Sequence, residues 1–168
     1  VLDAQDRKLI NTVLLDDVDL GAADSWDVAT SPNGEKIWVS HSGTHELSVI
    51  DANGLLAKLA TTKEPADVPN DLSFLVGLRQ RIPLPGRGPR GLAVVGSRAY
   101  AAEYFSDALA VVDLTADGQK PHVASIPLGP APKPTVERQG EMLFHDATIC
   151  FQHWQSCASC HPDGRADG

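Results

Sequence analysis

The sequence has no apolar run that approaches the roughly 18 residues needed to cross a bilayer. It also lacks an excess of basic residues, because 22 acidic and 14 basic side chains give its 168 residues a net charge of −8. We therefore expect no membrane span, and a nucleic-acid partner is disfavoured because such binding needs a basic surface. The 14 glycines and 12 prolines are too few for a collagen-like or low-complexity chain, and a hydrophobic content of 42% disfavours disorder of the whole chain.

The N-terminus lacks both an initiator methionine and a charged-then-apolar signal sequence, since the chain starts at Val1. At the other end, Gly168 follows closely on a cysteine motif that contains Cys160. We expect the chain to be a piece of a longer protein, so its localisation has to be inferred from its chemistry.

Residues 1–129 contain short strand-like stretches separated by turns. Residues 9–15 form an apolar, partly β-branched run. The Asn-Gly pair in 31–34 predicts a turn, because it supplies the positive φ that tight hairpins need, and 51–54 predicts another. Strands at this spacing favour an all-β sheet over βαβ units.

A repeated unit runs through this region. Residues 37–51 match residues 99–113 without a gap, at an offset of 62, and residues 26–29 correspond to 90–93. A four-stranded repeat of roughly 40–45 residues is typical of a β-propeller blade. The offset of 62 residues is longer than one such blade, which predicts an insertion near residues 55–79, consisting of a short helical turn and a long loop.

The segments 28–40 and 47–51 resemble the YVTN-type β-propeller repeat, although residues 95–98 replace the longer turn in the second unit. The resemblance implies a mainly β fold with about two blades and part of a third, to which residues 1–3 would belong. A closed propeller needs at least roughly four blades, so residues 1–129 would be an incomplete one.

Beyond this region the composition changes. Residues 130–137 contain three prolines within five residues, which predicts a stiff linker. Residues 138–147 have the pattern of a helix, with Met142, Leu143 and Phe144 as apolar contacts. We place a domain boundary in the linker, with the start of a second, α-helical domain at 138–168.

The residues that carry chemistry are Cys157, Cys160 and His161, which form a C-x-x-C-H motif. Two cysteines on one helical turn can each add to a vinyl group of haem, and the histidine then supplies a ligand to the iron. Pro162 would end this helical turn.

Three alternatives stay open for these cysteines. A thioredoxin-type site would need a βαβ context, which the sequence lacks. A zinc site could use Cys150, His153, Cys157 and Cys160, although the two pairs are closer together than in most zinc modules. A disulfide or inert thiols are the third reading.

The C-terminal segment resembles the start of the di-haem cytochrome c peroxidase/MauG-like domain, where a Gly-x-x-Leu-Phe-x-Asp helix precedes the first C-x-x-C-H. The matching helix residues are Gly140, Leu143, Phe144 and Asp146, and the matching haem-site residues are Cys157, Cys160 and His161. The resemblance implies a covalent haem c with His161 as the metal ligand. In that family the second haem motif and the distal ligands lie further on, so peroxidase activity is not carried over to this chain.

Several other residues could take part. Met142, His145 and His153 are candidate sixth ligands of the iron, although such residues more often pack or lie on a helix surface. Trp154 and Phe144 are expected to pack at the haem edge or in the core. Cys150 is expected to be a small buried residue, with a disulfide to an outside partner as the alternative.

Two loops and the C-terminal turn complete the candidates. His41 and His45 are expected to be exposed loop histidines, with a metal or ligand site as the alternative. Residues 103–107 form the equivalent loop of the next unit, and the difference in chemistry between the two loops hints at a substrate-binding or docking face. Residues 163–168 are expected to form a haem-edge turn in which Arg165 pairs with a haem propionate.

Together these features predict a haem-binding electron-transfer protein, a c-type cytochrome attached to a β-propeller, within a bacterial periplasmic or extracellular oxidoreductase. Its partner would be a redox protein or a small-molecule electron donor or acceptor. The alternative is a β-propeller binding or docking module whose C-terminal segment is structural, held by zinc or by thiols.

Overall fold

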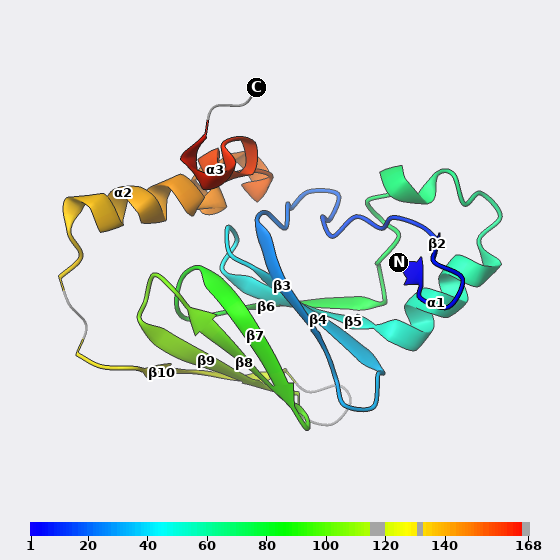
Figure 1. The fold of residues 1–168 in the computed structure, drawn as a ribbon, viewed down its shortest axis with the longest axis horizontal. Coiled ribbons are helices and arrows are strands. Elements are labelled where there is room, and N and C mark those ends of the chain that lie inside the picture. The colour runs from blue at the N-terminus through cyan, green and yellow to red at the C-terminus, as the bar shows by residue number, and fades with distance from the viewer. Residues whose placement is uncertain (115–119, 131–132, 166–168) are drawn as a thin grey trace.

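Two four-stranded antiparallel sheets form most of the computed structural model, which describes residues 1–114, 120–130 and 133–165. The first sheet contains β3 (Ser25–Thr30), β4 (Lys36–His41), β5 (Glu46–Asp51) and β6 (Arg79–Pro83) in that order. The second contains β7 (Pro89–Val95), β8 (Arg98–Glu103), β9 (Ala108–Asp113) and β10 (His122–Pro127). The first strands of the two sheets, β3 and β7, contact each other (Figure 1).

The pairing of the strands confirms the repeat. Trp38 pairs with Val49 in the first sheet, and Tyr100 pairs with Val111 in the second, so both partners shift by the same 62 positions. The first strand of each sheet also has an irregularity in pairing at the equivalent place, between Ser25 and Asp27 in β3 and near Pro89 in β7. The repeated sequence therefore folds into two copies of one four-stranded unit, and the predicted turn at 31–34 joins β3 to β4.

The insertion lies between β5 and β6, as predicted, and consists of α1 (Ala52–Thr61), the short helix η1 (Val68–Asn70) and connecting loops. The turn predicted at 51–54 is wrong, because α1 begins at Ala52, directly after β5. Gly54 lies in the first helical turn, where a Cβ would come within 2.7 Å of the Leu78 side chain. Close packing of the insertion, and not a reverse turn, explains this glycine.

Alternating apolar residues of both sheets pack into one core, as expected for strands whose successive side chains point to opposite faces. The main cluster consists of Trp38, Leu47, Val49, Ile82, Leu84, Ala99, Ala101, Ala110 and Val112. A second cluster, which includes Leu55, Leu59 and Phe74, packs the insertion against the other face of the first sheet. The sheets are therefore held by apolar burial on both sides of β4 and β5.

The N-terminal residues differ from expectation. Among the described N-terminal residues, only β1 (Leu2–Asp3) and β2 (Lys8–Leu9) pair as strands. The predicted part of a third blade is therefore a hairpin of two strands with two residues each. The apolar run 9–15 is mostly irregular, because its side chains serve packing: Val13 and Leu15 lie against the second cluster.

The C-terminal segment is helical and lies across one end of the two sheets (Figure 1). It contains α2 (Val136–His145), η2 (Ala147–Ile149), η3 (Phe151–His153), α3 (Cys157–Cys160) and η4 (Pro162–Gly164). The helix α2 begins inside the predicted linker 130–137, because the Thr135 hydroxyl caps it by accepting from the Arg138 N–H at 3.2 Å. Ala131 and Pro132 of that linker, and residues 166–168 of the predicted C-terminal turn, lie outside the described residues. None of the described helices has the length and apolar character of a membrane span.

Candidate functional site

The C-x-x-C-H motif forms one helical turn, as the sequence predicts. Ser156 and Ser159 make a capping box in which the Ser159 hydroxyl accepts from the Ser156 N–H at 3.0 Å. The His161 N–H donates to the Cys157 carbonyl at 2.9 Å, which makes the histidine the C-cap of the turn. Cys157 and Cys160 are free thiols and both are exposed.

A backbone contact orients the His161 ring. Its Nδ1 lies 3.0 Å from the carbonyl oxygen of Arg165. Because a carbonyl oxygen only accepts, Nδ1 carries a proton, and in the neutral imidazole the lone pair is then on Nε2. Histidines that bind metals are oriented in this way, through a hydrogen bond from the other ring nitrogen.

The motif lines a cavity of about 410 Å³, which we call the thiol pocket. This volume lies within the range of roughly 300–1,000 Å³ typical of ligand and cofactor sites. Its lining residues are Asp146, Ile149, Cys150, Gln155, Ser156, Cys157, Cys160 and His161. The thiols and the imidazole that a covalent haem requires therefore face one space, so the residues present fit that cofactor.

Cys150 is exposed on the same pocket, so its predicted burial is wrong. The surrounding segment lies on the surface, as shown by Phe151, whose exposed fraction is 80%. Among the described residues, no three His, Cys, Asp or Glu side chains are arranged to hold a metal ion. Cys150, His153, Cys157 and Cys160 are therefore not gathered as a zinc tetrad.

The candidate sixth ligands lie elsewhere: Met142, His145 and His153 are all described, and none is among the residues that line the thiol pocket. The Met142 sulfur is 3.8 Å from a guanidinium nitrogen of Arg87. His145 lines a second cavity of about 510 Å³, together with Trp26 and Phe144. Burial, followed by the charge of Arg90, lowers the pKa of His145.

Backbone contacts fasten the C-terminal segment to the loops at the end of the first sheet. The Gly21 N–H donates to the Gln152 carbonyl at 2.8 Å, and the Ala147 N–H donates to the Gly43 carbonyl at 3.0 Å. A Cβ at Gly21 would lie 2.5 Å from the His153 carbonyl oxygen. Only glycine allows this approach, so the loop before β3 is shaped to receive the segment.

Asp146, which follows α2, is a buried charged residue of the C-terminal segment, with an exposed fraction of 2%. Its carboxylate accepts from Arg87 at 3.2 Å and lies 3.4 Å from the His45 Nε2. Burial raises the pKa of Asp146, but hydrogen bonds from Thr148 and the charge of His45 lower it by more. The pKa of Asp146 is therefore lowered overall. His45 is therefore an anchor of the segment, and the prediction that it is an exposed loop histidine is wrong.

A second carboxylate holds the motif itself. Asp24, the residue before β3, accepts from the Ser156 hydroxyl at 2.6 Å and from the Ser159 hydroxyl at 2.7 Å. These are the two serines of the capping box, so one side chain from the loop before β3 holds the cysteine-bearing turn. Sequence reasoning missed Asp24, because no local pattern links it to serines 132 and 135 positions away.

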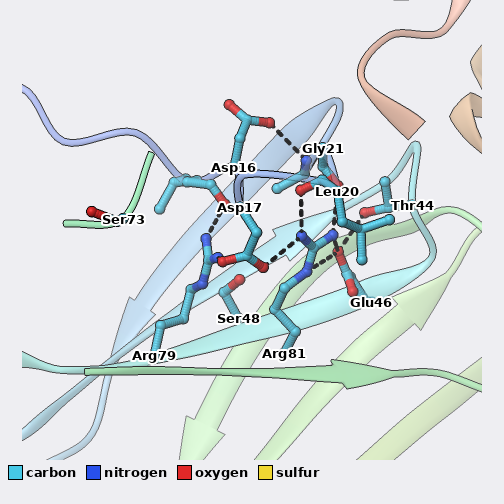
Figure 2. Close-up of polar contacts among 12 residues, drawn as sticks. Asp16, Asp17, Leu20, Gly21, Thr44, Glu46, Ser48, Ser73, Arg79 and Arg81 are labelled. Carbon is cyan, nitrogen blue, oxygen red and sulfur yellow. Dashed lines mark hydrogen bonds and ion pairs between the residues drawn. The ribbon is translucent and has the colours of Figure 1, made fainter. Parts of the chain in front are cut away.

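The loop 16–21, which precedes Asp24, is held by two arginines of β6, Arg79 and Arg81, as Figure 2 shows. Arg81 donates to the carbonyls of Leu20 at 2.8 Å and Gly21 at 2.5 Å, and pairs with Asp17 and the buried Glu46. Arg79 also pairs with Asp17. Burial lowers the pKa of Arg81, but hydrogen bonds and the charges of Glu46 and Asp17 raise it by more, so the pKa is raised overall.

His41 is fully buried at the end of β4, so the expectation of an exposed loop histidine is wrong here as well. Its Nδ1 lies 3.1 Å from the Ser25 hydroxyl and its Nε2 lies 2.8 Å from the Ser48 hydroxyl. Burial, followed by the charges of Arg81 and Arg79, lowers the pKa of His41 to about 4. His41 is thus a neutral histidine within the sheet.

The loop 103–107 of the second sheet contacts α2 of the same chain. Arg138 donates to the Tyr104 carbonyl at 2.5 Å, and its guanidinium lies 4.0 Å from the centre of the Tyr104 ring. Arg90 stacks between the rings of Trp26, at 4.2 Å, and Tyr104, at 3.7 Å. The loops of both sheets therefore contribute to one surface that carries the C-terminal segment.

This arrangement of two four-stranded antiparallel units belongs to the β-propeller class, which comparison with solved structures supports. Hydrazine synthase of Kuenenia stuttgartiensis, a β-propeller-containing protein, matches 62% of this chain with a TM-score of 0.58 and 24% identity. A periplasmic gluconolactonase of Pseudomonas aeruginosa, PpgL, matches 65% of the chain with a TM-score of 0.43 and 20% identity. The chain spans 31% and 27% of the lengths of these two proteins. No family model and no curated protein matches the sequence.

Proposed function

We propose that the chain is an electron-transfer protein that holds a c-type haem covalently through Cys157 and Cys160, with His161 as a ligand of the iron. The observation that supports this is the shared thiol pocket, into which α3 brings two exposed thiols and an imidazole whose Nδ1 is held by the Arg165 carbonyl. A haem in this position supplies one-electron redox chemistry. The chain's own residues anchor it, set the tautomer of His161 and fix the turn on the propeller.

The finer parts of the proposal follow from the sequence resemblances. The blades are of the YVTN type, and the C-terminal segment is the start of a peroxidase/MauG-like cytochrome domain within a larger oxidoreductase. Haem attachment of this kind takes place outside the cytoplasm, so we place the protein in the bacterial periplasm or on the cell surface. Its partner is then a redox protein or a small electron donor or acceptor.

Absorption spectroscopy tests the proposal directly. The full chain, exported in a bacterial host with cytochrome c maturation machinery, is expected to show a Soret band that stays with the protein after acid–acetone extraction. Replacing both Cys157 and Cys160 with alanine removes the band, because no thioether can form. The matched control is Cys150→Ala, which removes an exposed thiol from the same pocket and is expected to leave the haem content unchanged.

Two outcomes would overturn the proposal. Colourless, iron-free protein from a competent host contradicts haem attachment. Zinc at one equivalent per chain, lost in the Cys150→Ala variant, would instead favour a docking module with a zinc-stabilised C-terminal segment.

A further inference from the structure

The connection between the propeller and the cysteine-bearing turn runs through Asp24. Both of its carboxylate oxygens are used, one by Ser156 and the other by Ser159. Ser156 is the residue before Cys157, and Ser159 lies between the two cysteines. A single side chain from the loop before β3 therefore holds the turn on both sides of Cys157.

Asp24 is itself firmly placed. Its carbonyl accepts from the Ser42 N–H at 2.8 Å, and the preceding loop is held through the Gly21 carbonyl by Arg81. Its backbone lies in the left-handed region, with φ at 55°, where Asp and Asn are the best-tolerated residues after glycine. The contact is thus a fixed feature of the propeller edge.

The two carboxylates that anchor the segment, Asp24 and Asp146, differ in whether a cationic side chain pairs with them. Asp146 is paired with Arg87, whereas the Asp24 carboxylate accepts from two neutral hydroxyls and, among the described residues, forms no ion pair within 4.0 Å. Burial, followed by the charge of Arg90, lowers the pKa of His145 overall, and the negative charge of Asp24 acts in the opposite direction. A carboxylate without a cationic partner is the stronger electrostatic influence on a neighbouring redox site.

We propose that Asp24 is the positioning residue of the haem-binding turn and that its charge lowers the reduction potential of the haem. This inference rests on the proposed function. The Fe(III)/Fe(II) couple takes up one electron, and a nearby negative charge favours the more positive Fe(III) state. The propeller therefore tunes the haem as well as carrying it.

Three variants of the full chain separate the two roles. Asp24→Asn keeps the shape, the backbone preference and the hydrogen bonds, because serine hydroxyls can donate or accept. It is expected to retain the haem and to shift the midpoint potential to a more positive value. Asp24→Ala shows the same shift and also loses the hydrogen bonds, so the His161 amide exchanges with solvent roughly tenfold faster or more. The matched control is Asp107→Asn, an exposed aspartate with a similar φ of 48°, which is expected to change neither quantity.

The outcomes that contradict the inference are distinct. An unchanged potential in Asp24→Asn, relative to wild type and Asp107→Asn, overturns the electrostatic role. Unchanged amide exchange in Asp24→Ala overturns the positioning role. If the wild-type chain carries no haem, the proposed function and the tuning fail together, while exchange in that haem-free chain still decides whether Asp24 holds the turn.

Discussion

The two sheets and the C-terminal segment are held by different forces. In the sheets, Trp38 and Leu47 have exposed fractions of 1% and 0%, and apolar clusters lie on both sides of the first sheet. In the segment, neither α2 nor α3 contains a buried residue. The segment is instead fastened by hydrogen bonds and ion pairs to loops, through Asp24, Asp146 and the backbone of Gly21.

This difference shows that the C-terminal segment has little apolar burial of its own. Polar contacts place a chain accurately but contribute little net free energy, whereas apolar burial provides most of the stability of a domain. A segment with no core of its own needs a staple or a cofactor to become firmly folded. A haem anchored at Cys157 and Cys160 would add apolar contacts beside α3, which has no buried residue of its own.

The largest expected effect sharpens this contrast within the sheets. Trp38→Ala removes the largest fully buried side chain of the main cluster and is expected to lower the free energy of unfolding by about 3–5 kcal/mol. Phe151→Ala, in the C-terminal segment, changes it by less than about 0.5 kcal/mol, because that ring is exposed. Urea unfolding followed by fluorescence measures both. Equal losses in the two variants would show that the segment has a core of its own.

A buried ion pair tests the boundary between the two regions. Arg81→Met leaves Glu46, whose exposed fraction is 5%, without its cationic partner, and is expected to cost about 3–5 kcal/mol. It also releases the carbonyls of Leu20 and Gly21, so amide exchange in the C-terminal segment rises. The double variant with Glu46→Met recovers much of the stability but not the exchange protection. A double variant as unstable as Arg81→Met would contradict the role of the unpaired charge.

The sheets should also carry a pH dependence. The pKa of His41 falls from its ordinary value of 6.5 to about 4 on folding, so the unfolded chain binds the proton more tightly. The corresponding stability is fully present above pH 6.5 and is lost as the pH falls from there through 4, by up to about 3 kcal/mol. His41→Gln removes this slope while keeping hydrogen-bonding capacity toward Ser25 and Ser48. Unfolding curves at pH 7 and pH 4 measure the difference, and identical slopes would refute it.

Much of the fold was predictable from local pattern. The 62-residue offset identified the paired strands, because strand pairing repeats wherever the apolar alternation repeats. The helical turn of the C-x-x-C-H motif was also predictable, but from the spacing of its cysteines and from the following Pro162.

The contacts between the regions were not predictable. His41 and His45 belong to loop-like sequence, yet the first is covered within the sheet and the second by the C-terminal segment. Asp24 contacts serines more than a hundred positions away, and Arg81 reaches carbonyls about sixty positions away. Such pairs depend on the final arrangement of both regions, which no periodic pattern in one sequence encodes.

The smallest expected effect concerns the outer edge of the segment. Arg138 on α2 donates to the Tyr104 carbonyl, stacks on the Tyr104 ring and pairs with Glu141 at 2.8 Å. Arg138→Ala is expected to cost at most about 1 kcal/mol, because partly exposed ion pairs and cation–π contacts are weak. That loss falls on α2 alone, so its amides exchange faster while those of β4 and β5 stay unchanged. If the sheet amides change as well, the segment and the sheets unfold as one unit, and the distinction between their stabilising forces has no consequence for stability.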